Sequence, residues 1–488
     1  MAELGFGIMR FRDQKGREKL YLEKVISEYM KGEYCYFDIH PAYCDGKAQQ
    51  IFKDYVSSRY KRSQYLIANK MPYYGIEKYD DYINVFRKEL AECDVDYFDF
   101  YMLHCINERN YLYHKELGGF VFLKEIRKKY ANKVGISFHG TPELLKEILT
   151  VYEYIDFVQL QLNFYDWDNP IIQSRRCYEL AIRFGKEIVV MEPIKGGTLS
   201  RNMCVNNVRF DASQMADISL RFLNNMKGVS VILSGMTEIN HVANNRDSIK
   251  KSSLPYSYFE SLINEMKKEQ VVQCTKCRYC TLDCPKNIRI PEILECLNEG
   301  LENEEGGKTR FPFSRLNYRS IFQRQEASEC IKCGKCESVC PQNIYIRNCM
   351  SIAAKVFDQE ESEYDVYSIQ LKKSFLSHQV RRSMGGGKTY KVFAYGAGVV
   401  FEKMAHLITD KCVLQGVIDM NEAKHGTNIS GVQCIGLRQV SRDAFIIIIT
   451  RKESVFDEIA QRLENEGYTH FDSIWNWLSY ADDFQWES

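Results

Sequence analysis

The chain has 488 residues, of which 45% are hydrophobic and 27% are charged, so it is long enough for two to four globular domains. Lys+Arg and Asp+Glu are equal at 65 each, which gives no electrostatic case for binding nucleic acid or an anionic membrane. The first residues lack a basic segment followed by an apolar core, and no apolar run is long enough for a membrane span. We therefore expect a cytoplasmic protein.

Residues 1–255 alternate short apolar runs with longer amphipathic segments. The runs are rich in β-branched and aromatic residues, which predicts strands at residues 4–9, 34–39, 65–70, 98–104, 134–138, 157–163, 187–192 and 229–234. Helical patterns, such as 81–93 and 171–184, separate them. Eight strand–helix units predict an α/β domain that closes into a (β/α)8 TIM barrel. A doubly wound open sheet is the alternative, but its glycine-rich turn after the first strand is missing, because Gly5 and Gly7 lie within that strand.

Polar residues occupy the expected carboxyl ends of these strands, where barrel enzymes place their working groups. These residues are Asp38, Tyr43, Lys70, His104, Ser137, Gln159 and Asn163. A lysine ammonium beside a phenol lowers the pKa of the phenol, and a carboxylate keeps the lysine charged. Such a group can deliver a proton to an alkoxide while a histidine orients a carbonyl. Taken singly, Asp38 is explained as a helix cap and His104 as a buried histidine whose hydrogen bonds are satisfied. The occurrence of Asp38, Tyr43, Lys70 and His104 together at strand ends favours a site.

Eight of the eighteen cysteines form two copies of the pattern C-x2-C-x2-C-x3-C-P, which is typical of [4Fe–4S] ferredoxins. The first copy is Cys274, Cys277, Cys280 and Cys284, and the second is Cys330, Cys333, Cys336 and Cys340. The fourth cysteine of such a run usually ligates the other cluster. We therefore expect two clusters, one on Cys274, Cys277, Cys280 and Cys340, the other on Cys330, Cys333, Cys336 and Cys284. Structural zinc is the alternative, but a zinc site has no use for the third closely spaced cysteine.

The cysteine runs lie in residues 256–384, where helical patterns at 290–301 and 316–325 predict a helical two-cluster ferredoxin-like domain. Residues 303–308 read as a polar loop. The glycine-rich segment 385–389 resembles the end of a phosphate loop, but Arg382 stands where the first glycine of that motif belongs. We interpret residues 381–388 as a linker.

Residues 388–488 contain expected strands at 390–395, 413–419 and 445–450, with helices between them, which predicts a small Rossmann-like domain. Gly396 and Gly398 follow its first strand, and Asp419 ends its second, where such folds bind ribose. Phe401 occupies the position of a third glycine. A degenerate domain used for docking is therefore the alternative to a nucleotide-binding one.

Residues 1 to about 250 resemble the aldo-keto reductase family. The matching motifs are residues 37–43, 67–70, 99–104, 134–137, 158–159 and 191–197. The resemblance implies that Tyr43 is the general acid, that Lys70 and Asp38 tune it and that His104 orients the carbonyl. It also implies that Ser137, Gln159 and Asn163 contact the nicotinamide of NAD(P)H.

By the same resemblance, the adenosine phosphate of the cofactor binds near Ser234, Gly235, His241, Asn244 and Asn245. The family's NADPH-preferring pattern has a lysine near Gly235 and an arginine at His241. An imidazole is a poorer partner for a 2′-phosphate than a guanidinium group, so the choice between NAD and NADP stays open.

The chain up to about residue 355 resembles a subgroup of this family that carries a two-motif ferredoxin module after the barrel. The segment 392–398 resembles nucleotide-binding Rossmann-like folds, most of all small domains that bind nucleotide sugars. Together these resemblances imply an iron–sulfur oxidoreductase that acts on a carbonyl or alcohol. The match to the subgroup implies no particular substrate; our hypothesis is a sugar or nucleotide-linked sugar, with an electron-transfer protein as a candidate partner.

One difficulty accompanies this interpretation: nicotinamide transfers two electrons as hydride, whereas each cluster transfers one, and the sequence shows no flavin motif. Either a partner feeds the clusters, or the clusters are structural, or the barrel does not use nicotinamide. Two alternative functions therefore remain. One is an electron-transfer or sensor protein on a non-reducing barrel, and the other is a nucleotide-sugar-binding scaffold in polysaccharide synthesis.

Overall fold

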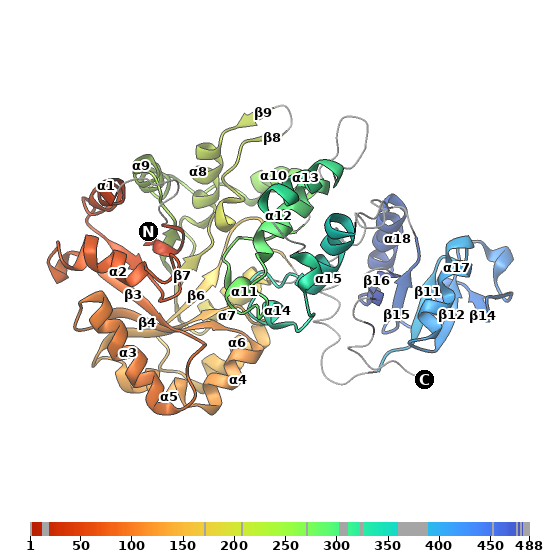
Figure 1. The fold of residues 1–488 in the computed structure, drawn as a ribbon, viewed down its shortest axis with the longest axis horizontal. Coiled ribbons are helices and arrows are strands. Elements are labelled where there is room, and N and C mark those ends of the chain that lie inside the picture. The colour runs from red at the N-terminus through yellow and green to blue at the C-terminus, as the bar shows by residue number, and fades with distance from the viewer. Residues whose placement is uncertain are drawn as a thin grey trace. The chain divides into compact units, whose positions relative to one another are not determined.

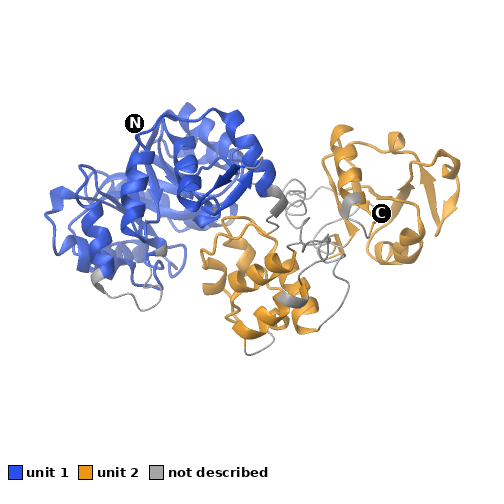
Figure 2. Ribbon diagram, turned by 90° about the horizontal axis from the view of Figure 1, so that it is seen from above, with its two compact units in different colours: residues 1–266 blue, residues 267–488 orange. Residues whose placement is uncertain are grey.

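A computed structural model describes residues 2–11, 19–169, 172–205, 208–269, 272–301, 311–322, 326–359, 389–450, 453–474, 477–478 and 481. The chain forms two compact units, Met1–Met266 and Lys267–Ser488 (Figure 2). The first unit extends beyond residue 255 because it includes most of helix α10, Tyr256–Glu269. The predicted boundaries of the three domains remain predictions. No helix in the described part of the chain has both the length and the apolar character needed to span a membrane.

Eight parallel strands close into a barrel in the first unit, as the sequence predicts (Figure 1). In chain order the strands are β1 Glu3–Gly7, β2 Tyr36–Asp38, β3 Leu66–Met71, β4 Phe98–Ile106, β5 Ala131–Phe138, β6 Phe157–Gln161, β7 Glu187–Met191 and β10 Val229–Ser234. Strand β1 pairs in parallel with both β2 and β10, which closes the barrel. The open doubly wound sheet is therefore wrong for this unit.

Helices surround the barrel (Figure 1). Before α10 they are α1 Lys19–Tyr29, α2 Ala48–Phe52, α3 Tyr79–Cys93, α4 Glu108–Glu116, α5 Gly119–Ile126, α6 Pro142–Val151, α7 Ser174–Arg183, α8 Ala212–Leu223 and α9 Ile239–Ser248. Helix α6 begins after Thr141, whose hydroxyl accepts a hydrogen bond from the backbone N–H of Leu144 at 3.4 Å. A short antiparallel hairpin, β8 Met203–Val205 with β9 Val208–Phe210, was not expected from the sequence.

Buried side chains fill the barrel interior, so it is a packed core and not a channel. The interior cluster consists of Tyr36, Ala68, Phe100, Met102, Phe157, Val189, Val231 and Leu233. Gly135 of β5 lies opposite Phe157 of β6. A Cβ atom there would lie 2.4 Å from the carbonyl oxygen of Phe157, so only glycine fits.

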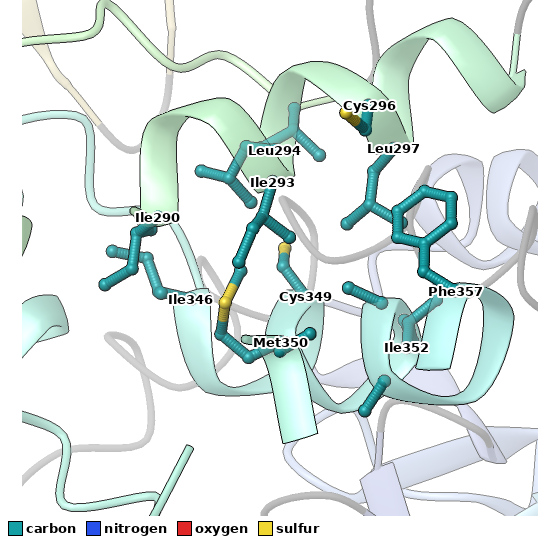
Figure 3. Close-up of a cluster of buried hydrophobic side chains, with 14 of the residues drawn as sticks. Ile290, Ile293, Leu294, Cys296, Leu297, Ile346, Cys349, Met350, Ile352 and Phe357 are labelled. Atoms are coloured by element: carbon teal, nitrogen blue, oxygen red, sulfur yellow. The ribbon is translucent and has the colours of Figure 1, made fainter. Parts of the chain in front are cut away.

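The cysteine-bearing part of the second unit is helical, as predicted. Its helices are α11 Tyr279–Leu282, α12 Ile290–Leu301, α13 Phe311–Ile321, α14 Lys335–Ser338 and α15 Ile346–Ala353. Figure 3 shows apolar side chains of α12 and α15 facing one another, among them Ile293, Leu297 and Met350. The buried positions of α12 recur at helical spacing, which explains why the sequence pattern located this helix correctly. Helix α13 begins at Phe311, five residues before the predicted start, and the expected loop at 303–308 lies outside the described residues.

The last part of the chain contains a six-stranded sheet in the order β13-β14-β12-β11-β15-β16. The strands are β11 Val392–Tyr395, β12 Leu414–Ile418, β13 Asn428–Ile429, β14 Val432–Ile435, β15 Phe445–Ile448 and β16 Phe471–Ser473, and the helices are α17 Val399–Thr409 and α18 Glu453–Asn465. The sequence predicted β11, β12 and β15, which form the parallel centre of the sheet. The other three strands have two to four residues each and carry too little pattern to be detected. The expected linker at 381–388 lies outside the described residues.

Candidate functional site

Asp38 and Lys70 form a buried ion pair between neighbouring strands of the barrel. Asp38 is the last residue of β2, and Lys70 lies near the end of β3. The Nζ atom of Lys70 donates hydrogen bonds to Oδ1 of Asp38 and, at 3.1 Å, to the carbonyl oxygen of Ile39. Burial lowers the pKa of Lys70, and the neighbouring Asp38 carboxylate opposes that shift. The pair therefore fixes the ammonium group of Lys70 at the carboxyl end of the barrel, with its charge balanced by Asp38.

The ring of Tyr43 lies over this charge. The Nζ atom of Lys70 is 4.9 Å from the centre of the Tyr43 ring, and the tyrosine is 7% exposed. The loop after β2 turns sharply here, since the backbone N–H of Tyr43 bonds the carbonyl oxygen of His40 at 3.0 Å and Cys44 has a φ of 55°. An ammonium beside a phenol stabilises the phenolate, so this geometry suits the release of a proton from Tyr43.

His104 completes the group from β4. Its ring centre lies 6.4 Å from that of Tyr43 and 4.0 Å from that of His40. The pKa of His104 lies well below its usual value because the ring is buried, and the nearby His40 and Lys70 lower it further. A neutral imidazole can orient a carbonyl oxygen without competing with Tyr43 as a proton source.

The amides of Gln159 and Asn163 are engaged within the protein. The Nε2 atom of Gln159 donates to Oδ2 of Asp38 at 2.9 Å. The Nδ2 atom of Asn163 donates to Oδ2 of Asp166 at 3.0 Å and to the carbonyl oxygen of Glu192 at 3.1 Å. Ser137, by contrast, has only long contacts, 3.4 Å to Nε2 of His139 and 3.8 Å to Sδ of Met191. Of these three residues, Ser137 has the side chain least committed to protein partners.

A second buried ion pair, Asp166 with Lys195, lies after β6 and β7 and was missed by the sequence reasoning. Nζ of Lys195 is 2.7 Å from each carboxylate oxygen of Asp166, and both side chains are nearly inaccessible. Gln161 donates to the same carboxylate at 2.6 Å. Because Asp166 also accepts a hydrogen bond from Asn163, this pair fixes the loop that follows β6. Lys195 lies in a motif that was noted only for its family resemblance.

The predicted phosphate-binding residues lie at the end of β10 and on α9. The hydroxyl of Ser234 accepts a hydrogen bond from Nδ2 of Asn245 at 3.0 Å, which joins strand to helix. Gly235 follows directly, and a Cβ atom there would still be 3.9 Å from the nearest carbonyl oxygen, so the position is open. His241 is exposed on α9. The structure thus brings these residues to one end of β10.

The eight motif cysteines line two cavities in the second unit. One cavity is lined by Cys274, Cys277, Cys280 and Cys340, and the other by Cys284, Cys330, Cys333 and Cys336. Each cavity thus takes three cysteines from one motif and one from the other, which is the grouping that the spacing predicts.

The backbone around the two cavities is closely similar. Lys276 and Arg278 in the first motif have positive φ, as do Lys332 and Gly334 at the equivalent positions of the second. The left-handed backbone conformation at these positions turns each short loop back on itself, so that three cysteines of the motif line the same cavity. Burial raises the pKa of Cys274 to about 12, so a group of such thiolates needs a positively charged centre. The donor set therefore fits an iron–sulfur cluster.

In the C-terminal sheet, the loop after β11 and the end of β12 lie together, and a lysine joins them. Lys424 pairs with Asp419 at 2.8 Å and donates to the carbonyl oxygen of Ala397 at 2.9 Å. Ala397 lies between Gly396, which has a φ of 108°, and Gly398, the residue before α17. The carboxylate predicted to bind ribose thus has a protein partner in this structure.

Comparison with protein families agrees with this architecture. The model of the aldo/keto reductase family matches residues 3–264, more than half of the chain, and the chain belongs to this family. The model of the 4Fe-4S dicluster domain matches residues 273–345, so the cysteine-bearing part is an iron–sulfur module. The comparison with curated proteins found no match.

Solved structures of aldo-keto reductases are similar to the barrel. The holo form of an enzyme from Bacillus halodurans is 20% identical, with a TM-score of 0.41, over 54% of this chain and 91% of that one. An enzyme from Klebsiella pneumoniae in complex with NADPH is 14% identical, with a TM-score of 0.41, over 54% of this chain and 90% of that one.

Proposed function

We propose that the barrel reduces a carbonyl compound, or oxidises the matching alcohol, with a nicotinamide cofactor. The observation that carries this proposal is the buried Lys70–Asp38 pair beneath the ring of Tyr43, with His104 beside it. Four residue types that suit proton delivery to an alkoxide lie together at the carboxyl end of the barrel, where barrel enzymes bind their substrates.

In this proposal, each residue has one task. Tyr43 gives its proton to the substrate oxygen, and the charge of Lys70 stabilises the phenolate that remains. Asp38 keeps Lys70 charged and fixed in a buried position. His104, neutral because of its burial, donates a hydrogen bond to the carbonyl oxygen and sets its orientation. Reduced nicotinamide, when bound, supplies the hydride that completes the reduction.

Ser137, Ser234, Gly235, His241 and Asn245 are the residues that we propose to hold the cofactor. Ser137 lies near the end of β5, and the other four residues lie at the end of β10 or on α9. A single imidazole at His241 favours a cofactor without a 2′-phosphate, so we expect NADH to be used at least as well as NADPH. Gln159 and Asn163 act by fixing Asp38 and the β6 loop.

We further propose that each cysteine-lined cavity holds one [4Fe–4S] cluster and that a separate electron-transfer protein exchanges electrons with them. Each cluster supplies one-electron chemistry. Cys333 is exposed, whereas Cys277, the second cysteine of the other motif, is only partly exposed, so the cavity that contains Cys333 is the more accessible at this position. A sugar-type carbonyl is the proposed substrate, and a nucleotide-linked sugar fits the presence of Asp419 in the C-terminal sheet.

The test is the reduction of a panel of aldehydes and ketones by anaerobically purified protein with NADH or NADPH. Tyr43→Phe removes the proton donor, and we expect kcat to fall by about 100-fold or more. Tyr65→Phe is the matched control. Tyr65 is also a buried tyrosine, but it directly precedes the amino end of β3, whereas the candidate site lies at the carboxyl end. A parent protein that reduces nothing, or a Tyr43→Phe variant equal to the parent, refutes the reductase.

A second candidate is an electron-transfer or sensor protein on a non-reducing barrel, and the engaged amides of Gln159 and Asn163 favour it. In that case neither NADH nor NADPH binds, although the clusters still accept electrons from a reduced ferredoxin. Nicotinamide titration followed by fluorescence separates this function from the first. A third candidate, a scaffold that binds a nucleotide sugar at Gly396, Gly398 and Asp419, is tested by calorimetry with nucleotide sugars. A ligand at this site would share the carboxylate of Asp419 with Lys424.

A further inference from the structure

His40 lies in the loop between Asp38 and Tyr43, and one nitrogen of its imidazole has no hydrogen-bond partner within the described part of the chain. The ring is 1% exposed. Its Nδ1 accepts a hydrogen bond from the backbone N–H of Ala42 at 3.2 Å. In a neutral ring the proton is then on Nε2, and this buried nitrogen has no hydrogen-bond partner among the described residues. A buried donor left unpaired is costly, so one that persists requires an explanation.

The surroundings of His40 are those of the candidate active site. Its ring centre lies 4.0 Å from that of His104, 5.2 Å from that of Tyr43 and 6.4 Å from that of Tyr74. The Nδ1 side of the ring faces its own backbone, so Nε2 lies on the opposite edge of the ring. The donor is therefore held beside the two side chains that are proposed to bind the reacting oxygen.

The charge of this environment restricts what His40 can bind. Burial lowers the pKa of His40 well below its usual value, and Lys70 adds to this effect, so the ring stays neutral. Lys70 is matched by Asp38, and His104 is also neutral. The group around His40 therefore consists of neutral donors and a balanced ion pair. Such a site suits an uncharged hydroxyl oxygen better than a carboxylate.

We propose that Nε2–H of His40 binds a second oxygen of the substrate, on the carbon next to the reacting carbonyl, so that the site prefers uncharged α-hydroxycarbonyl compounds. The inference rests on the proposed reductase activity and narrows its substrate class. A site with a buried donor discriminates against an analogue that lacks the matching oxygen, because that donor is then left unpaired. His40 thus determines specificity, whereas Tyr43 and His104 act on the reacting oxygen.

The experiment compares lactaldehyde with propanal, which differ only in the hydroxyl next to the carbonyl. We expect the parent to show a kcat/KM for lactaldehyde at least about 10-fold higher than for propanal. His40→Ala should reduce this ratio by about 10-fold or more, chiefly through KM. His40→Gln, which keeps a side-chain N–H at a similar reach, should restore most of it.

The outcomes separate the two proposals. A parent that reduces both aldehydes without preference, or a His40→Ala variant that lowers both values by the same factor, overturns the role of His40 and leaves the reductase in place. If His40→Gln fails to restore a ratio lost in His40→Ala, the donor is not the cause and the role of His40 is overturned as well. A parent that reduces neither aldehyde nor any other carbonyl refutes the proposed function itself, and the inference with it.

Discussion

The amide of Gln159 donates a hydrogen bond to Oδ2 of Asp38 at 2.9 Å, although 121 positions separate the two residues in the chain. Gln159 lies in β6 and Asp38 in β2, and in the closed barrel three strands separate β2 from β6 in either direction. The hydrogen bond therefore crosses the barrel. Lys70 holds one oxygen of the Asp38 carboxylate and Gln159 holds the other, so the orientation of the carboxylate is fixed from two sides.

Replacement of Gln159 tests this link across the barrel. Gln159→Leu leaves one oxygen of a buried carboxylate without its donor, which should reduce the free energy of unfolding by about 1–3 kcal/mol. Gln50→Leu is the control, because Gln50 makes an exposed hydrogen bond to Asp54 at 2.6 Å and should change stability by less than about 0.5 kcal/mol. Urea unfolding of the barrel measures both. Equal effects of the two substitutions would show that the crossing bond contributes nothing of its own.

The second ion pair supplies another prediction. Lys195→Met leaves the Asp166 carboxylate buried without its cation, and we expect a loss of about 3–5 kcal/mol in the free energy of unfolding. The double variant Lys195→Met with Asp166→Leu removes both charges and should recover more than half of that loss. The same urea titration compares the two. A double variant that is less stable than the single one contradicts the interpretation of Lys195 and Asp166 as a matched pair.

The stability of the barrel should decrease in acid because of its buried histidines. Burial lowers the pKa of His139 to about 4, whereas an unfolded chain takes up a proton near pH 6.5. Between these values the unfolded state binds more protons, so stability falls as the pH falls, by about 1.4 kcal/mol per pH unit for this one group.

His139→Asn should therefore make the decrease in stability between pH 6.5 and pH 5 less steep by roughly that amount. Unfolding midpoints at three pH values for parent and variant measure the difference, so any loss of the clusters in acid affects both proteins alike. A variant whose stability depends on pH as steeply as that of the parent rules out His139 as a contributor.

The grouping of the cysteines predicts the iron content of double variants. Cys274→Ser with Cys340→Ser affects one cavity only, so about four irons per chain should remain of about eight. Cys274→Ser with Cys284→Ser affects both cavities and should leave almost none. Ligation of each cluster by its own motif alone would give the opposite result. Cys204→Ser is the control, because Cys204 is exposed and lies outside both cavities. Iron analysis and electron paramagnetic resonance of anaerobic protein give the answer.

The fold was predictable from the sequence where one pattern, an apolar run followed by an amphipathic helix, repeats. Eight apolar runs sufficed for the barrel, since strands buried on both faces read as continuous apolar segments. The start of α13 was wrong because Pro312, a residue favoured in the first turn of a helix, was not used as a start signal. The hairpin of β8 and β9 and the strands β13, β14 and β16 are held by pairing with neighbours, which so short a segment does not encode locally.

The candidate site was predictable to a similar degree. Asp38, Lys70 and His104 come together because the carboxyl ends of parallel strands meet at one end of a barrel. What the sequence did not reveal is which donor reaches which acceptor. Contact of Gln159 and Asn163 with a cofactor stays a prediction, whereas the hydrogen bonds of their amides to Asp38, Asp166 and the backbone of Glu192 were not foreseen. His40 lies in the motif 37–43, in which the sequence pointed only to Asp38 and Tyr43. The burial of His40, and the lack of a partner for its Nε2 among the residues that the structure describes, become visible only in the structure.

The sharing of cysteines between the two cavities sets an order of events during synthesis. The cavity that begins with Cys274 is incomplete until the ribosome has translated Cys340, and the other cavity needs Cys284 from the earlier segment. Neither cavity therefore has its four cysteines until the second motif has been translated. Both sites are therefore completed late in the synthesis of this module. A chain that ends between the two motifs would hold Cys274, Cys277 and Cys280 without their fourth partner, Cys340.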